Sequence, residues 1–224
     1  MASFFNLILD TIAPAGVTMV INDNAEYTIA AAVNLKIGTT DVSTEGYQMK
    51  VWGDITDATD EASAVWQTYT AEKAVTLTTG DAQKTVNIKL RDDVGNESVV
   101  VSDTIILNTV VPVVTISGPD KSKISKVEGF DTAILSFTSD VDFLEYKVCV
   151  VNTSNAQQNA GIVIPLTAGS ANTSGTTDEE DIFKSATPIE VTIKGADLEA
   201  ASTGDGTKIV KVFVKNIAGT WSVA

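Results

Sequence analysis

Four oxygen-bearing side chains are of the types that bind calcium and could converge at one end of the fold. Asp10 follows a short apolar run, and Asp92, Asp93 and Asn96 share one turn after an expected strand. Calcium takes about six to eight oxygen ligands, which carboxylates and amides supply. The corresponding positions later in the chain carry no carboxylate; they are Asn108, Asn216 and Ile217. We therefore expect no metal ligands and keep calcium at this turn as an alternative.

Nucleophilic catalysis lacks its usual residues in this sequence. The chain contains no histidine, which is the commonest general base and a common zinc ligand. The single cysteine, Cys149, lies in an apolar run and is expected to pack as a small buried hydrophobe. A serine–lysine pair stays open, although no recognisable motif marks one. Asp140 and Asp142 fall in an expected turn, which carboxylates commonly stabilise. We predict no catalytic residue and no cofactor.

Trp52 and Trp66 are the aromatic residues that invite a binding interpretation. Tryptophan rings most often pack in a core or along a sheet edge. Stacking on a carbohydrate is the alternative, but the two residues form no row of exposed rings in the sequence. We expect a packing role for both.

Charge and hydropathy restrict the partners of the chain. The formal net charge is −14, so the protein should repel nucleic acid phosphates and anionic lipids. No window approaches the roughly 20 apolar residues of a membrane span. Residues 1–10 lack the basic start of a secretion signal. We expect no nucleic acid partner, no membrane partner and synthesis in the cytoplasm.

An internal repeat organises the chain. Residues 80–98 have the sequence GDAQKTVNIKLRDDVGNES, and residues 204–222 have the sequence GDGTKIVKVFVKNIAGTWS, with no gap between the two. Apolar and polar residues alternate, which indicates a half-buried strand followed by a turn. The alternation predicts that Ile88, Leu90, Val212 and Val214 face an interior, with Lys89 and Lys211 on the other side.

Two proline joints divide the chain into modules. Residues 7–14 have the sequence LILDTIAP and residues 105–112 have the sequence IILNTVVP. Proline fixes an extended path and cannot donate to a central ladder. Seven short strands with frequent turn signals are expected in the first module, which predicts a two-sheet sandwich: Val17–Ile21, Val33–Ile37, Tyr47–Trp52, Val65–Tyr69, Ala74–Leu77, Val86–Arg91 and Val99–Leu107. We predict an all-β protein with domains at residues 1–111 and 112–224.

The second module repeats the first and adds a long insertion. Ala133–Phe137 corresponds to Val33–Ile37, and Tyr146–Val151 corresponds to Tyr47–Trp52. The extra length is assigned to residues 152–185. Within it, the acidic stretch 172–181 is expected to be exposed and poorly ordered, with contact to a partner as the alternative. Residues 196–201 are expected to form one helical turn.

The two ends of the chain suggest an exchange of strands. In the first module a last strand, 99–107, follows the repeat, whereas the second module stops after Ser222. Residues 3–9 occupy the matching place before the first joint. A sandwich without an edge strand exposes backbone groups and an apolar groove. We hypothesise that residues 3–9 complete the second module of the same or a neighbouring chain, and so support a homo-oligomer; the alternative is pairing with their own module or another protein.

The joint and the strand–turn unit resemble those of known repeat modules. Leu9-Asp10-Thr11-Ile12-Ala13-Pro14, with the Gly80-Asp81 strand and the turn of residues 91–98, is similar to the immunoglobulin-like modules of tailed-phage virion proteins and bacterial surface adhesins. The joint at residues 108–112 and the turn at residues 215–222 depart from that pattern. The resemblance implies two tandem immunoglobulin-like antiparallel β-sandwiches, displayed at a surface and without catalysis.

The same resemblance leads to the expected function. An acidic pair of modules with no export signal favours a virion over an adhesin. We expect a non-enzymatic virion structural protein of a tailed bacteriophage, made in the host cytoplasm. It would decorate the capsid or tail and bind other virion proteins there. The alternatives are a glycan-binding or adhesive module that contacts a host cell surface, and an accessory domain of a hydrolase.

Overall fold

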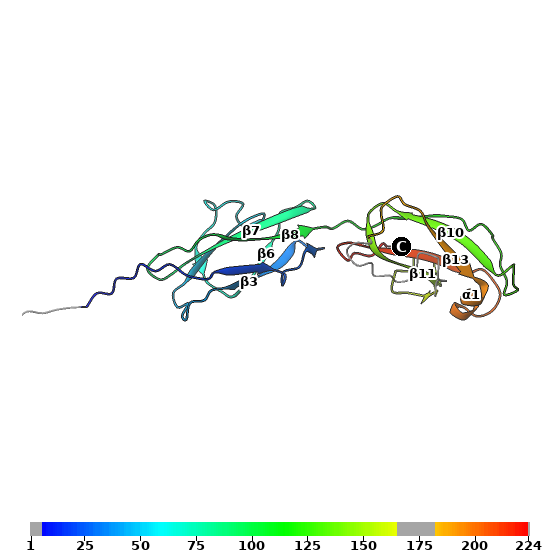
Figure 1. Cartoon of the computed structure of the whole chain (residues 1–224), viewed down its shortest axis with the longest axis horizontal. Coiled ribbons are helices and arrows are strands. Elements are labelled where there is room, and N and C mark those ends of the chain that lie inside the picture. The colour runs from blue at the N-terminus through cyan, green and yellow to red at the C-terminus, as the bar shows by residue number, and fades with distance from the viewer. Residues whose placement is uncertain (1–5, 165–181, 224) are drawn as a thin grey trace, which may run out of the picture. The chain divides into compact units, whose positions relative to one another are not determined.

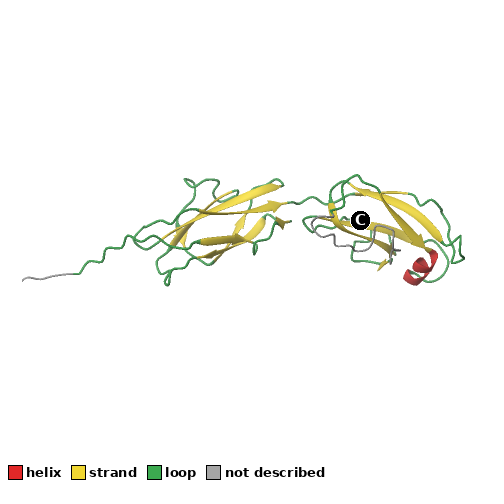
Figure 2. Cartoon of the chain, viewed as in Figure 1, coloured by secondary structure: helices red, strands yellow, loops and turns green. Residues whose placement is uncertain are grey.

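The chain folds into two compact, almost entirely β units. The computed structural model describes residues 6–164 and 182–223. The units comprise Met1–Thr109 (unit 1) and Val110–Ala224 (unit 2) (Figure 1). Strands dominate both units, and unit 2 also contains one short helix (Figure 2). The expected all-β architecture of two tandem immunoglobulin-like sandwiches is therefore confirmed.

Unit 1 consists of two sheets that face each other across one core. One sheet has the order β1-β3-β6, and the other has the order β2-β8-β7-β4-β5. The strands are β1 (Thr18–Ile21), β2 (Tyr27–Thr28), β3 (Ala32–Gly38), β4 (Gln48–Gly53), β5 (Gln67–Thr68), β6 (Glu72–Thr76), β7 (Ala82–Arg91) and β8 (Val101–Leu107). All seven expected strands are present, with shifted ends. The sequence pattern did not predict β2, which pairs in parallel with β8.

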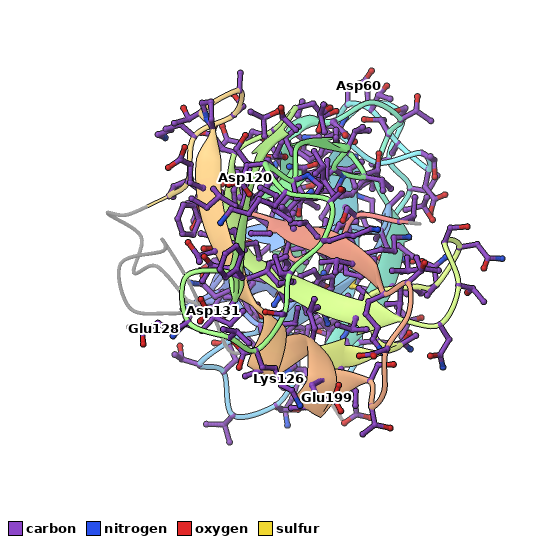
Figure 3. All side chains as sticks on the ribbon, turned by 90° about the vertical axis from the view of Figure 1, so that its right-hand side faces the viewer. Asp60, Asp120, Lys126, Glu128, Asp131 and Glu199 are labelled. Atoms are coloured by element: carbon purple, nitrogen blue, oxygen red, sulfur yellow. The ribbon has the colours of Figure 1, made fainter. Side chains whose placement is uncertain are left out.

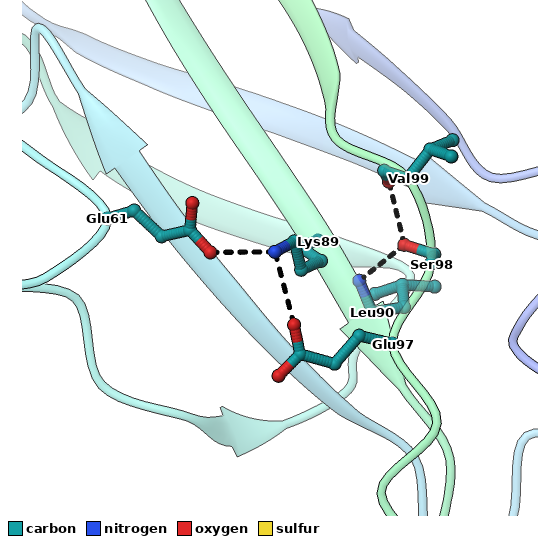
Figure 4. Close-up of polar contacts among 6 residues, drawn as sticks. All are labelled: Glu61, Lys89, Leu90, Glu97, Ser98 and Val99. Atoms are coloured by element: carbon teal, nitrogen blue, oxygen red, sulfur yellow. Dashed lines mark hydrogen bonds and ion pairs between the residues drawn. The ribbon is translucent and has the colours of Figure 1, made fainter.

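Strand β7 lies in the middle of its sheet, as its alternation predicts. Ile88 and Leu90 are completely buried in the core of unit 1. Lys89, between them, points to the other face, where its Nζ lies 2.7 Å from Glu61 Oε1 and 3.1 Å from Glu97 Oε2 (Figure 4). Because a slip of one residue would exchange these two faces, the burial confirms the predicted register of this strand.

Unit 2 repeats this plan, with fewer strands among its described residues. Its sheets have the orders β13-β10-β9 and β12-β11-β14. The strands are β9 (Val114–Ser117), β10 (Thr132–Ser139), β11 (Phe143–Val151), β12 (Ile162–Val163), β13 (Ile189–Lys194) and β14 (Ile209–Asn216). Val212 and Val214 are buried as predicted. Lys211 Nζ instead donates to the backbone carbonyls of Ser154 and Ala156.

The extra residues of unit 2 occupy two places rather than one. The segment before β13 carries β12, whose neighbour Ile164 is buried, and Phe183, which forms a bridge with Phe143. The predicted stretch 172–181 lies outside the described residues. The remaining extra length lies between β13 and β14, where the helix α1 (Gly195–Ala201) forms. The expected helical turn is thus confirmed, whereas the assignment of the whole insertion to residues 152–185 is wrong.

Charged side chains lie outside the core of unit 2. Lys126, Glu128 and Glu199 lie at the outer edge of the ribbon (Figure 3). The interior holds an aromatic cluster of Phe137, Phe143, Tyr146 and Phe183, which unit 1 lacks among its described core residues. The Phe143 and Phe183 rings stack with centroids 4.9 Å apart. Unit 2 therefore secures the end of its insertion by aromatic packing.

Tyr146→Phe is expected to leave unit 2 as stable as before, or slightly more stable. Tyr146 is fully buried, and its hydroxyl has no hydrogen-bond partner among the described residues. Burial raises the pKa of Tyr146 to about 12, so the group stays a neutral phenol. An unsatisfied buried hydroxyl costs roughly 1–3 kcal/mol. Chemical denaturation of the two proteins measures the difference, and a clear loss of stability would show that the hydroxyl has a partner.

Candidate functional site

The turn after β7 is built around one carboxylate. Asp92 is buried, and its Oδ1 accepts hydrogen bonds from the backbone N–H of Asn96 at 2.8 Å and of Val94 at 3.1 Å. Its Oδ2 accepts from Asn96 Nδ2 at 2.7 Å. Short polar side chains commonly close turns in this way. Asp92 is therefore engaged in holding the turn.

The turn after β14 has the same hydrogen bonds. Asn216 Oδ1 accepts from the N–H of Thr220 at 2.8 Å and of Ala218 at 3.1 Å. Gly95 and Gly219 occupy the same position in the two turns, with φ of 93° and 91°. Glycine adopts this left-handed conformation without a steric penalty. The sequence repeat is thus a repeat of hydrogen-bonded geometry.

A buried serine closes each turn onto its strand. Ser98 Oγ accepts from the N–H of Leu90 at 3.0 Å, and Ser222 Oγ accepts from the N–H of Val214 at 3.2 Å. Figure 4 shows the Ser98 hydroxyl between Leu90 and the carbonyl of Val99, to which it donates. These hydroxyls satisfy buried backbone groups, so they serve the fold in both units.

Asp92→Asn is expected to weaken unit 1 at neutral pH and to remove part of its acid sensitivity. Burial raises the pKa of Asp92, but hydrogen bonds from Asn96, Val94 and Gly95 outweigh burial and hold the pKa below its usual value. A carboxyl with a lowered folded pKa contributes stability above its unfolded pKa of about 3.9 and loses it as the pH falls through the folded value. The variant has no carboxyl at this position, so this contribution disappears.

Amide resonances of unit 1, followed by NMR during unfolding at several pH values, test this expectation. Unit 2 is an internal control, because asparagine already occupies position 216 in the same turn. An equally steep loss of unit 1 stability below about pH 4 in the variant would contradict a titrating Asp92.

Three of the four residues proposed for calcium line one cavity of unit 1. This cavity has a volume of about 620 Å³, and Asp10, Asp92 and Asp93 line it together with Asp41 and Glu45. Asp41 Oδ2 accepts from Tyr47 and Thr39, and Asp92 is saturated by its turn. Across residues 6–164 and 182–223, no three acidic, cysteine or histidine residues are grouped closely enough to hold a metal.

The calcium hypothesis also requires that the first joint, which contains Asp10, lies beside the turn that contains Asn96. Asn96 Nδ2 also donates to the backbone carbonyl of Asp10 at 3.4 Å, so the first joint does meet the turn as expected. Of the later counterparts, Asn108 belongs to unit 1, and Asn216 and Ile217 belong to unit 2. Asn216 uses its amide to bond the carbonyl of Val110 at 2.8 Å. The turn residues thus bond the chain segment that enters each unit.

Among the described side chains, one lysine contacts a serine hydroxyl. This lysine is Lys208, and the repeat aligns it with Lys84 of unit 1. Lys208 Nζ lies 3.3 Å from Ser202 Oγ, but it also donates to the carbonyl of Gly204 at 2.6 Å. Its counterpart Lys84 bonds Thr78 Oγ1 at 3.1 Å and the carbonyl of Thr79 at 3.3 Å. Both lysines thus bond backbone carbonyls of the loop before their strand, and the Lys208–Ser202 contact belongs to this loop closure.

The tryptophans pack as expected. Trp52 is buried against Ala58 and Ala64. Trp66 lies under Arg91, whose guanidinium carbon is 4.4 Å from the ring centre. This cation–π contact contributes modestly to stability.

The other candidate residues have structural roles. Cys149 is buried, and burial raises the pKa of its thiol, as expected for a small hydrophobe. Asp140 accepts from the N–H of Val113 at 2.8 Å. Asp142 accepts from the N–H of Ser185 at 2.8 Å and pairs with Lys184, which together lower its pKa. These carboxylates connect distant segments, and their role is not confined to their own turn.

Unit 2 contains a groove, which the sequence predicted as the apolar surface left open by a missing strand. It has a volume of about 880 Å³. Its floor contains Leu135, Ile193 and Val210, and its rim contains the loops 118–124 and 205–208. We refer to it as the unit 2 groove. It lies at the side of the sandwich where β9 and β14 are the edge strands.

Comparison with known proteins finds similarity to solved structures alone. No family model and no curated protein matches the chain. One similar structure is that of fibronectin(III)-like modules of Clostridium thermocellum CbhA, at 11% identity and a TM-score of 0.48, covering 92% of this chain and 90% of that one. Dimeric latent PorU of Porphyromonas gingivalis has 11% identity and a TM-score of 0.30, with 96% and 20% covered.

A third similar structure is chitinase ChiA74 of Bacillus thuringiensis, at 13% identity and a TM-score of 0.32, with 92% of this chain and 30% of that one covered. The strand orders and repeated turns described above define the class as a tandem immunoglobulin-like β-sandwich protein. In the described part of the chain, no helix is long and apolar enough to cross a membrane.

Proposed function

We propose that the chain is a non-enzymatic structural protein of a tailed bacteriophage particle, which decorates the capsid or the tail. The single observation that carries the proposal is the repeated module itself. Both units use the same strand, the same closed turn and the same buried serine. A pair of like modules suits a protein whose task is to extend from, or cover, a repeating surface.

The chemistry of the described side chains is consistent with this role. The polar groups of the repeat hold turns and strands: Asp92 holds its turn, Ser98 holds β7 and Lys84 closes the preceding loop. The virion context comes from the resemblance of the first joint and of the turn at residues 91–98 to phage modules. In this proposal the chain is made in the host cytoplasm and binds other virion proteins.

Co-sedimentation with virus particles tests the proposal. Particles of the virus that encodes the chain are separated on a density gradient, and the chain is quantified in each fraction by mass spectrometry. The proposal predicts a constant number of copies per particle in the particle peak. A matched control is an unrelated acidic protein of similar mass, added to the same lysate, which should stay at the top of the gradient.

Two results would count against the proposal. In the first, the chain remains at the top of the gradient with the control protein. In the second, both the chain and the control protein appear in the particle peak, and a salt wash removes both. If the chain does not co-sediment with particles but binds specific glycans on an array, the adhesive alternative is favoured.

A further inference from the structure

Among the described residues, unit 2 has no counterpart of the strand β8 that closes unit 1. In unit 1, β7 lies between β4 and β8, whereas its counterpart β14 has a neighbour on one side only, β11. Among the described residues of unit 2, no strand pairs with the other side of β14. The regular part of β14 begins at Ile209, although the repeat aligns Gly206 with Ala82, where β7 begins. Unpaired backbone groups at an edge favour addition of a strand.

The unit 2 groove lies where the missing strand would place its side chains. In unit 1, Ile105 and Leu107 of β8 are 1% and 3% exposed and fill the core opposite Lys84 and Ala82. The corresponding positions in unit 2, Lys208 and Gly206, both line the groove.

The opposite wall of the sandwich shows the same difference. Met19 of β1, which pairs with Ile37 of β3, is 5% exposed. Ile116 of β9, which pairs with Phe137 of β10, is 43% exposed and lines the groove. The apolar side chains that β8 covers in unit 1 are therefore partly open to solvent in unit 2. Burial of such surface is the main favourable contribution to association.

A carboxylate at the groove rim lacks the partner that its counterpart has. In unit 1, Asp81 accepts two hydrogen bonds from Thr109, one from the N–H at 2.9 Å and one from the hydroxyl at 2.8 Å. The repeat aligns Asp81 with Asp205, which lines the groove. Asp205 accepts no hydrogen bond from any other described residue. An occupant with a threonine just after its apolar residues would restore the contact.

Residues 6–11 of this chain match these requirements. Leu7, Leu9 and Thr11 align with Ile105, Leu107 and Thr109 through the two joints. Leu7, Ile8 and Leu9 are 86%, 90% and 87% exposed, and the segment forms no strand in its own unit. Consecutive exposed apolar residues commonly mark an interaction site.

Charge also favours this occupant. Lys121 and Lys123 line the groove, and residues 1–14 contain one acidic residue, Asp10, and no lysine or arginine. Opposite charges favour the correct pairing more than they raise affinity. The basic loop therefore favours a segment of this composition over a basic one.

The geometry of unit 1 favours donation by another copy. Asn96 holds Asp10 at the Arg91 end of β7, whereas the chain leaves unit 1 at Thr109, beside the Ala82 end. The ten residues of β7 separate these ends by about 30 Å at roughly 3.3 Å per residue. Residues 7–9 reach only about 10 Å beyond Asp10. Residues 7–9 therefore extend from the end of unit 1 that is opposite to the exit of the chain at Thr109, which favours another copy as the donor.

We infer that residues 6–11 of a second copy of this chain enter the unit 2 groove as an added strand beside β14. Leu7 lies opposite Lys208, Leu9 lies opposite Gly206, and Thr11 donates to Asp205. The contact joins unit 2 of one copy to unit 1 of the next through a joint that repeats the covalent one at residues 105–112. Such a head-to-tail contact closes into a ring or extends as a filament. It requires no virion role for the chain.

Light scattering after size exclusion, over a wide range of concentrations of the 224-residue chain, tests the inference. The mass should rise above the 23.5 kDa of one chain as the concentration increases. Leu7→Asp combined with Leu9→Asp should remain at the mass of one chain, because both side chains enter the groove. Both residues are exposed in the free chain, so folding of the units should not change.

Ile8→Asp is the matched control, because Ile8 aligns with Ile106, which points away from the core. This variant should still assemble. Added to the wild-type chain, the Leu7→Asp/Leu9→Asp variant should shorten the assemblies, because its groove still accepts a strand. Thr11→Val and Asp205→Ala should each weaken assembly several-fold, and the double variant should be no weaker than either.

Three outcomes would overturn the inference. The wild-type chain would have the mass of one chain at every concentration, or the Leu7→Asp/Leu9→Asp variant would assemble like the wild type. In the third, Ile8→Asp would abolish assembly as completely as the double variant does, which would show that non-specific apolar contact joins the copies.

Discussion

Phe137→Ala is expected to lower the free energy of unfolding of unit 2 by about 3–5 kcal/mol, the usual cost of removing a buried phenylalanine ring. Phe137 is 1% exposed, and its ring centre lies 5.0 Å from that of Tyr146 and 6.2 Å from that of Phe143. Truncation removes these contacts and leaves a cavity between the two sheets. Chemical denaturation followed by unit-specific NMR signals measures the change.

Phe130→Ala is the matched control for this substitution. Phe130 is the same residue type in the same unit, but it is 71% exposed. Its replacement should change stability by less than about 0.5 kcal/mol, as is usual for a surface site. Equal effects at positions 130 and 137 would show that the aromatic cluster is not the core of unit 2.

Leu90→Ala is expected to destabilise unit 1 by about 2–5 kcal/mol. Leu90 is fully buried and packs with Ile88, Met49 and their neighbours in one core. Because β7 lies between two strands, the surrounding side chains have little freedom to close the cavity. The midpoint of urea unfolding, with unit 2 signals as an internal reference, gives the difference.

The exposed valine at position 42 provides the control for Leu90→Ala. Val42→Ala removes apolar atoms from a fully solvent-exposed position in the same unit and should be nearly neutral. If Leu90→Ala lowers the free energy of unfolding by less than about 0.5 kcal/mol, the register described for β7 is wrong, since a shift of one residue exchanges its two faces.

Local sequence patterns predicted the strands and turns of the repeat. Apolar and polar residues alternate in β7 and β14 because one face of each strand is buried and the other faces solvent. The sequence alone therefore placed Leu90 and Val214 on the buried face and Lys89 on the other. The repeat also predicted the paired turns, because each requires glycine at a positive φ and a short polar side chain at its start.

Long-range contacts could not be predicted in the same way. The two residues of β2 carry no pattern, and their parallel pairing with β8 depends on the path of the chain. The aromatic cluster joins Phe183 to Phe143 across the insertion, which no local signal marks. The split of the insertion depends on α1, which has only seven residues.

The candidate site shows the same division. The calcium alternative placed Asp10 and Asn96 at one end of the sandwich, and the structure joins them by a hydrogen bond from the Asn96 amide to the Asp10 carbonyl. The sequence could not show that Asp92 is saturated by its own turn, since that depends on which backbone N–H groups point inward. The sequence predicted an apolar groove beside a missing strand of unit 2, but its lining by Ile116 and Leu198 depends on packing that no local pattern marks.

Cryo-electron microscopy of particles of the virus that encodes the chain tests the central claim most directly. The account predicts density on the capsid or tail into which the two sandwich units fit, repeated with the symmetry of the surface beneath. The density should disappear from particles assembled without the chain. Particles that contain no such density, and that are unchanged when the chain is absent, would contradict a structural role in the virion.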